Sequence, residues 1–163
     1  MFLFLSLLFT GCSTEEAPVV QPNKTAEKAV NAKHEEHKHP KAEGVAPTEK
    51  PPAGAKVMFV SPADGAKLKS PVKVVFGLEG MKIQPAGKLT SGTGHHHLMI
   101  DAKAAEFGQA VPADAQHIHF GKGQTETEVE LKPGEHTLVM QFADGVHRSY
   151  GPQMSSTIKI TVE

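Results

Sequence analysis

Hydrophobic and polar residues alternate along the C-terminal two thirds of the chain with the period of two that is typical of β-strands. In the clearest example, Thr127, Val129 and Leu131 alternate with three glutamates. The pattern predicts seven short strands, at residues 57–60, 72–78, 96–101, 117–120, 126–131, 136–142 and 158–162. No stretch combines a helical stripe with helix caps. The sequence therefore predicts an all-β domain at residues 56–163.

Turn-forming residues separate the predicted strands. Lys132-Pro133-Gly134-Glu135 has Pro and Gly at the two central positions of a type II turn, which predicts a hairpin between 126–132 and 136–142. Seven short strands in about 100 residues are typical of an immunoglobulin-like β-sandwich, and a small, partly open barrel is the alternative. Because the chain has no Trp and one Cys, antibody-type domains are excluded.

The N-terminus carries an apolar run, residues 2–9, that ends at Thr10-Gly11-Cys12. The run is too short for a membrane span of about 20 residues, but it fits the apolar centre of a secretory signal. Together with Cys12 it resembles a bacterial lipoprotein signal. The resemblance implies removal of residues 1–11, lipidation of Cys12 and, because Ser13 follows, sorting to the outer membrane. No Lys or Arg precedes the run, which indicates a natural start upstream of Met1.

Residues 12–55 combine the lipidated Cys12 with a segment that is rich in Ala, Pro, Lys and Glu. From residue 13 to 55 there is no Leu, Ile, Met, Phe or Tyr, so the segment cannot bury enough apolar surface to fold and is predicted to be a disordered tether. Within it lie His34, His37 and His39. This tract is either a secondary site of metal capture or a solvated polar run.

Seven of the ten histidines fall in the predicted domain. Since residues two apart on a strand share a face, His95 projects with His97, and His117 with His119. Imidazole pairs on rigid strands suit copper or zinc. The candidate ligands are His95, His96, His97, His117, His119 and His136. In the alternative interpretation these histidines are structural, buried and hydrogen-bonded to carbonyl groups.

Several motifs resemble an uncharacterised bacterial family, catalogued as a domain of unknown function and found in exported, often lipid-anchored proteins. The most distinctive are Gly94-His95-His96-His97-Leu98 and His117-Ile118-His119-Phe120-Gly121-Lys122-Gly123-Gln124-Thr125-Glu126. The resemblance implies a shared all-β domain over residues 56–163, without an established activity. The second motif is also similar to the copper-binding strand of copper/zinc superoxide dismutases, but that family needs a disulfide, which one cysteine cannot form.

The charge balance and the missing catalytic motifs narrow the function classes. Seventeen Lys and Arg balance 18 Asp and Glu, which excludes the basic surface that nucleic-acid binding requires. The chain has neither a phosphate loop nor a Gly-x-Ser-x-Gly elbow. We therefore expect a non-enzymatic protein that binds a transition metal ion, copper or zinc, for storage or delivery.

The expected lipid on Cys12 indicates where the protein is located. Several acyl chains on Cys12 would hold the protein firmly at the outer membrane or cell envelope, with its domain in the periplasm or at the cell surface. The expected partners are the membrane, the metal ion and an envelope protein. The alternative function is a structural or protein-interaction module of the cell envelope with purely structural histidines.

Overall fold

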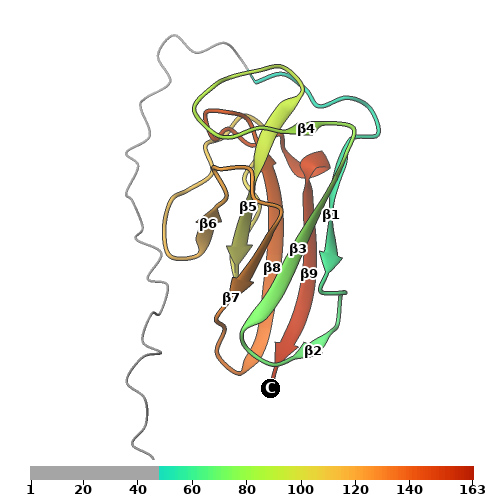
Figure 1. Ribbon diagram of the computed structural model, residues 1–163, viewed down its shortest axis with the longest axis vertical. Helices are drawn as coiled ribbons and strands as arrows, with labels where there is room; N and C mark the ends of the chain where they lie inside the picture. Colours follow the sequence, from blue (N-terminus) through green and yellow to red (C-terminus); the bar gives the residue numbers. More distant parts are fainter. Residues whose placement is uncertain (1–47) are drawn as a thin grey trace, which may run out of the picture. The chain divides into compact units, whose positions relative to one another are not determined.

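The computed structural model of the protein describes residues 48–163 (Figure 1). Within this range the chain forms nine strands and one short 3-10 helix, η1 (Pro152–Met154). The strands are β1 (Lys56–Ser61), β2 (Lys67–Leu68), β3 (Val72–Glu79), β4 (Lys82–Ile83), β5 (Thr93–Ile100), β6 (His117–His119), β7 (Glu126–Val129), β8 (Gly134–Ala143) and β9 (Ser155–Val162). Seven of them match the predicted strands, and β2 and β4, of two residues each, are additional.

The strands form two sheets. One sheet has three strands in the order β1-β3-β7, and the other has the order β2-β9-β8-β5-β4, with β6 paired to β5. In Figure 1 strands β3 and β7 lie across β8 and β9. Antiparallel pairing dominates, and only β2 with β9 and β4 with β5 run parallel. The predicted all-β sandwich is therefore confirmed.

The core lies between the inner faces of the two sheets. Val72, Val74 and Phe76 of β3 are buried against Leu98 of β5 and Met140 of β8. Alternation along each strand sends one set of side chains into this layer and the other set outward. Burial of a side chain such as Leu98, which is fully enclosed, stabilises the fold by about 1.5–3 kcal/mol.

The predicted hairpin between residues 126–132 and 136–142 is wrong. Strand β7 pairs with β3 in the small sheet, whereas β8 lies in the large sheet between β9 and β5. Strand β9 pairs with β8 from Gly134 to Gln141 and β5 pairs with its other edge from Leu138 to Ala143, so most of β8 has no free edge for β7. The Lys132–Glu135 turn instead carries the chain from one sheet to the other.

A smaller apolar cluster covers the outer face of the large sheet. Met99 of β5 and Val139 of β8 are buried there under Val111 and Ala105, which belong to the long β5–β6 connection. This cover gives β5 buried side chains on both of its faces. An outward-facing residue of β5 is therefore enclosed as completely as an inward-facing one.

Residues 48–55 were assigned to the tether, and they are irregular in the described structure. They also contact the domain: Ala55 joins the core, and Gln153 Nε2 donates to the Pro52 carbonyl at 3.0 Å. The signal segment 1–11, Cys12, the histidines at 34, 37 and 39 and the tether up to residue 47 lie outside the described residues. Within the described part, no helix has the length and apolar character needed to cross a bilayer.

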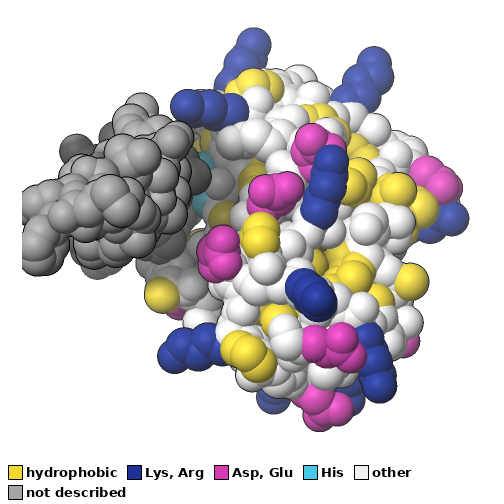
Figure 2. All heavy atoms as spheres, turned by 60° about the horizontal axis from the view of Figure 1, so that its bottom comes forward, with side chains coloured by type: hydrophobic (Ala, Val, Ile, Leu, Met, Phe, Trp, Pro, Cys, Tyr) yellow, Lys and Arg dark blue, Asp and Glu magenta, His cyan; other side chains and the backbone are white. Residues whose placement is uncertain are grey.

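Charges of both signs are interleaved on the face shown in Figure 2, without a continuous field of either sign. The glutamates at 126, 128 and 130 are all exposed, as expected for a solvated strand face. Two of them have partners: Glu126 pairs with Lys73 at 3.3 Å, and Glu130 accepts a hydrogen bond from the Ser70 hydroxyl.

Candidate metal centre

Four imidazole rings converge on the outer face of the large sheet. The Nε2 atom of His95 lies 3.0 Å from Nε2 of His97 and 3.1 Å from Nε2 of His119. The Nε2 atom of His147 lies 3.1 Å from that of His119. For His95, His97 and His119, one ring nitrogen from each lies within 4.8 Å of the others, a spacing at which they could hold one metal ion. We call the four residues the histidine quartet.

Strand β5 supplies the two most rigid members of the quartet. His95 and His97 point to the same face of the strand, and both rings are buried. Their backbones pair with Ala143 and Gln141 of β8. Neither Nδ1 atom has a hydrogen-bond partner among the described residues, so apart from the Nε2 contacts within the quartet only packing orients the two rings. Gly94 allows β8 to approach closely here, since a Cβ at this position would lie 2.1 Å from the Ala143 carbonyl oxygen.

His119 reaches the quartet from β6, which pairs with β5 on the side opposite β8. The register places His119 directly across from His97. Its ring folds back over Gly121, where a Cβ would lie 2.3–2.5 Å from ring atoms. A side chain at position 121 would therefore occupy the space of the imidazole, and only glycine leaves the ring in this position.

His147 comes from the loop after β8, and its φ of 69° lies in the left-handed region. Such a conformation is uncommon for a residue with a side chain and costs about 1–3 kcal/mol unless the surroundings hold it. Asp144, which is 1% exposed, accepts hydrogen bonds from the N–H groups of Val146 and Arg148 and from the Arg148 side chain. This carboxylate therefore closes the loop in the shape that presents His147.

The loop is also fixed from outside. Gly145 lies so close to the β4–β5 connection that a Cβ at position 145 would lie 1.9 Å from the Lys88 carbonyl oxygen. On its other side, the Val111 N–H donates to the His147 carbonyl at 2.9 Å. The fourth imidazole is therefore clamped between two connections that are distant in sequence.

The two quartet imidazoles on β5, His95 and His97, are neutral at physiological pH. Burial, and then repulsion from His147 and His119, lowers the pKa of His95 from 6.5 to about 3. Burial and the neighbouring imidazoles likewise hold the pKa of His97 well below 6.5. A neutral imidazole keeps one nitrogen lone pair, which is the form that binds a metal ion.

The other three candidate ligands lie apart from the quartet. His96 points into the core, where its ring lies 5.1 Å from the rings of both Phe76 and Phe142. Neither of its ring nitrogens has a partner within the described structure. The Nδ1 atom of His117 contacts the Asp114 carboxylate at 2.7 Å. His117 therefore has a local partner of its own, whereas His96 is held by packing alone.

His136 is held as a charged imidazolium. Its Nδ1 faces the Asp101 carboxylate at 2.8 Å and its Nε2 faces the Lys132 carbonyl at 2.9 Å. Since both partners only accept hydrogen bonds, both nitrogens must donate, and first the carbonyl and then the carboxylate raise the pKa of His136. An imidazolium has no lone pair for a metal ion.

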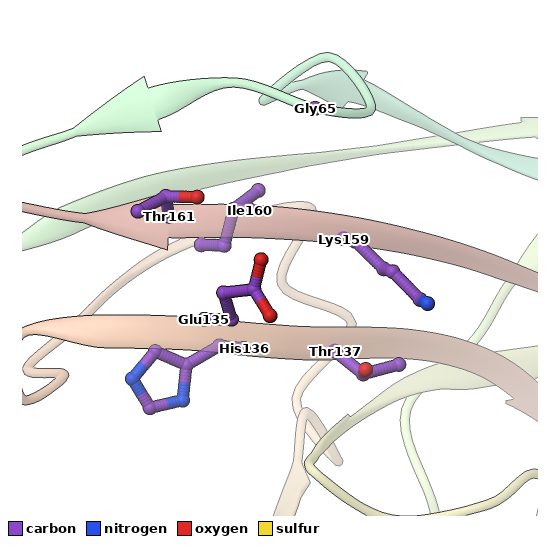
Figure 3. A pocket seen from close by; sticks show the side chains of 7 residues that line it. All are labelled: Gly65, Glu135, His136, Thr137, Lys159, Ile160 and Thr161. Atoms are coloured by element: carbon purple, nitrogen blue, oxygen red, sulfur yellow. The ribbon is translucent and has the colours of Figure 1, made fainter.

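His136 also borders a surface hollow of about 330 Å³ that is lined by the paired strands β8 and β9 and by Gly65 of the β1–β2 turn (Figure 3). The ring points away from Glu135, which extends toward β9. Glu135 and Lys159 supply one charge of each sign to the lining. The hollow is separate from the histidine quartet and adds no ligand to it.

Of the six domain histidines proposed from the sequence, the structure brings together His95, His97 and His119. The fourth ring of the quartet, His147, was not among them. It stands alone in the sequence, without a paired histidine two residues away, and its position depends on a loop conformation. The available signal was the Asp144-Gly145 turn directly before it, which indicates a tight connection after a buried strand.

Comparison with known proteins places the domain in a family. The family model described as "Domain of unknown function (DUF4399)" matches residues 74–163, which include every member of the quartet. No curated protein and no solved structure shows significant similarity to the chain. The family resemblance expected from the histidine motifs is therefore confirmed, and the chain belongs to the family of domains of unknown function DUF4399.

Proposed function

We propose that this protein binds one transition metal ion, zinc or copper, through His95, His97, His119 and His147. A single observation carries the proposal: three contacts of 3.0–3.1 Å link the four Nε2 atoms one to the next, in the order His97, His95, His119 and His147. His95 Nε2 and His119 Nε2 each take part in two of these contacts. A single nitrogen cannot form a hydrogen bond in both of its contacts, so protons alone do not account for all three contacts.

The argument rests on how many bonds an imidazole nitrogen makes. In the ring plane, Nε2 has either one hydrogen or one lone pair, so it takes part in one well-directed hydrogen bond. Four such atoms in a row therefore form at most two hydrogen bonds, and one close contact is left between two nitrogens without a shared proton. A cation bound to all four lone pairs removes this conflict, because every nitrogen then faces the same positive charge.

The number of ligands favours binding over catalysis. Catalytic zinc sites keep one coordination position open for water or substrate, whereas closed sites fill all four with protein ligands. Four imidazoles would leave no open position. We therefore propose a role in storage or delivery of the ion, and no enzymatic activity.

We further propose that the protein acts in the cell envelope, anchored at the outer membrane through lipidated Cys12. Support comes from the sequence of residues 1–13, which resembles a lipoprotein signal. His34, His37 and His39 would then provide secondary metal capture, and an envelope protein would supply or accept the ion.

The alternative is a structural or protein-interaction module of the envelope. The observation that favours it is that His117 and His136 have hydrogen-bond partners of their own and His96 packs in the core. If the quartet were structural in the same way, replacing its members would change the stability of the domain without any dependence on metal.

Titration of the full chain tests the proposal. Cys12→Ser removes the proposed lipid attachment site, and replacing His34, His37 and His39 with Ala removes the other candidate ligands, so that the measured heat reports binding to the domain. We call this variant the tract-free chain. Calorimetric titration with Zn(II), Cu(II) and, without oxygen, Cu(I) should show one ion per chain with a Kd below about 10 μM, or about 7 kcal/mol.

Matched variants locate the site. His95→Ala, His97→Ala, His119→Ala and His147→Ala should each weaken binding at least about tenfold. His136→Ala, which lies outside the quartet, should bind as the parent does. The proposal is overturned if no ion binds more tightly than about 10 μM, or if the four quartet variants retain the parent affinity.

A further inference from the structure

The spacing of the quartet rings indicates the geometry of the ion that they would hold. A four-coordinate metal places its ligands at the corners of a tetrahedron or of a square. With metal–nitrogen bonds of about 2.0–2.1 Å and about 1.2 Å from Nε2 to the ring centre, a tetrahedron gives six centroid distances of about 5.2 Å. A square with the same bonds gives four distances of about 4.5 Å and two of about 6.4 Å.

All six centroid distances in the quartet are short. From His95, they are 4.8 Å to His97, 4.9 Å to His119 and 5.0 Å to His147. The remaining three are 5.1 Å for His97–His119, 5.9 Å for His97–His147 and 4.6 Å for His119–His147.

No choice of opposite pairs turns these distances into a square. A square needs two long diagonals that share no ring. The longest distance is the 5.9 Å between His97 and His147, and the pair that would form the other diagonal, His95 and His119, is only 4.9 Å apart. The four ring centres therefore form a tetrahedron that is slightly open along one edge.

The protein backbone fixes this arrangement. His95 and His97 are fully enclosed on a strand that is paired on both sides, so their rings cannot swing into one plane with the others. On the opposite side, the packing of His119 against Gly121 and the hydrogen bonds that Asp144 accepts hold the two remaining rings. Flattening the site would require the two enclosed β5 rings to leave their packed positions.

Ions differ in how they tolerate such a site. Zn(II) has a filled d shell and no preferred geometry of its own, so it accepts a tetrahedron, whereas Cu(II) and Ni(II) favour square or tetragonal arrangements. Imidazole suits Zn(II), while Cu(I) prefers the sulfur of Cys or Met. The proposed ligand set consists of imidazoles alone.

We infer that the histidine quartet is a tetrahedral Zn(II) site that disfavours Cu(II) and Ni(II) by its geometry. This inference rests on the proposed function, since it names the ion class for the same four ligands. Cu(II) ordinarily binds nitrogen ligands more tightly than Zn(II) does. In the quartet, this advantage is reduced because Cu(II) must adopt a geometry that it does not favour.

Spectroscopy of the tract-free chain tests the inference. Co(II), which reports the geometry of zinc sites, should give the intense visible absorption of a tetrahedral complex, and one equivalent of Zn(II) should remove it. Cu(II) should show an electron paramagnetic resonance spectrum with a smaller copper hyperfine splitting than a square-planar histidine complex. His147→Ala should change the position and intensity of the Co(II) band and weaken Co(II) binding, because water would replace the lost imidazole, and His136→Ala should leave both unchanged.

Each result is decisive. A weak Co(II) band in the parent, an ordinary tetragonal Cu(II) spectrum that depends on His147, or anaerobic Cu(I) displacing equimolar Zn(II) would overturn the tetrahedral zinc assignment and leave metal binding intact. Absence of any ion from the quartet would overturn both the assignment and the proposed function. The intense Co(II) band, its change in His147→Ala and its displacement by Zn(II) would support both.

Discussion

His97 on β5 and His119 on β6 are direct cross-strand partners, and their rings stack with centroids 5.1 Å apart. The same register pairs Met99 with His117. Both β5 and β6 carry two histidines at a spacing of two, and the register decides which member of the β6 pair meets the quartet. The two β6 histidines therefore form a matched pair of positions, one inside the site and one beside it.

The first prediction uses this pair. In the tract-free chain, His119→Ala should weaken Zn(II) binding at least about tenfold, whereas His117→Ala should change it by less than about threefold. The reason is that His119 Nε2 lies 3.1 Å from two other quartet nitrogens, while His117 contacts Asp114. Calorimetric titration measures both. Equal losses in the two variants would contradict the assignment of His119.

The second prediction concerns the space under the His119 ring. Gly121→Ala should weaken Zn(II) binding because the added Cβ would lie 2.3–2.5 Å from atoms of the imidazole and displace the ring. The fold should survive, since the glycine lies in a connection outside the strands. Far-ultraviolet circular dichroism checks the fold and titration checks the affinity. Parent affinity in a folded Gly121→Ala protein would show that the ring does not need its present position.

The third prediction tests the loop that presents His147. Asp144→Asn should lower the free energy of unfolding by about 3 kcal/mol, because it removes a buried charge that faces the partly buried Arg148 side chain. It should also weaken Zn(II) binding, since the same carboxylate holds the turn before His147. Chemical denaturation and titration measure the two effects. As a control, Asp114→Asn, whose carboxylate contacts His117, should leave the zinc affinity unchanged.

The fourth prediction separates the core histidine from the quartet. His96→Leu should leave Zn(II) affinity unchanged and raise the free energy of unfolding by about 1 kcal/mol, because the buried ring has no hydrogen-bond partner for either nitrogen among the described residues. Leucine suits the apolar surroundings of Phe76 and Phe142. Denaturation and titration of the variant give both values. A loss of zinc affinity would mean that His96 supports the site in a way that its position does not explain.

The fifth prediction is the pH dependence of stability without metal. Burial lowers the pKa of His96 from 6.5 to about 4, and the pKa of His95 falls to about 3. Below pH 6.5 the unfolded chain therefore binds protons that the folded domain does not. The stabilisation is complete above pH 6.5 and is lost as the pH falls toward 4 and then 3.

The expected size follows from linkage. His96 alone should account for a loss on the order of 3 kcal/mol between pH 6.5 and 4. Urea denaturation of the metal-free protein across this range measures the loss, and His96→Leu should show a smaller one. A flat profile from pH 6.5 to 4 would contradict the burial of these neutral rings.

The strands were predictable from the sequence because alternation is a local property. The faces of β5 followed in the same way: period two places His95 and His97 together and sends His96 to the other side, where it joins Leu98 in the core. The pairing of β7 was not predictable from its turn. Which sheet a strand joins depends on which edges are already occupied, and this is a property of the whole fold.

The site was predictable only where it depends on strand geometry. Spacing identified the β5 pair and the β6 pair, but it could not show that the register brings His119 rather than His117 into the quartet. His136 followed the same alternation, yet its partners, Asp101 and the Lys132 carbonyl, come from connections whose course the pattern does not predict. His147 depends on a left-handed backbone conformation and a buried carboxylate, which leave no periodic signal.

The four imidazoles come from three separate parts of the chain, so the proposed site would exist only after the domain has folded. If the chain crosses a membrane unfolded, as the proposed lipid anchor implies, the ion would bind after translocation and would come from outside the cytoplasm. The bound ion would then stabilise the folded domain by about 2.7 kcal/mol at a free metal concentration one hundred times the Kd. At low zinc concentrations, a larger fraction of the protein would be unfolded and would be cleaved more readily by proteases.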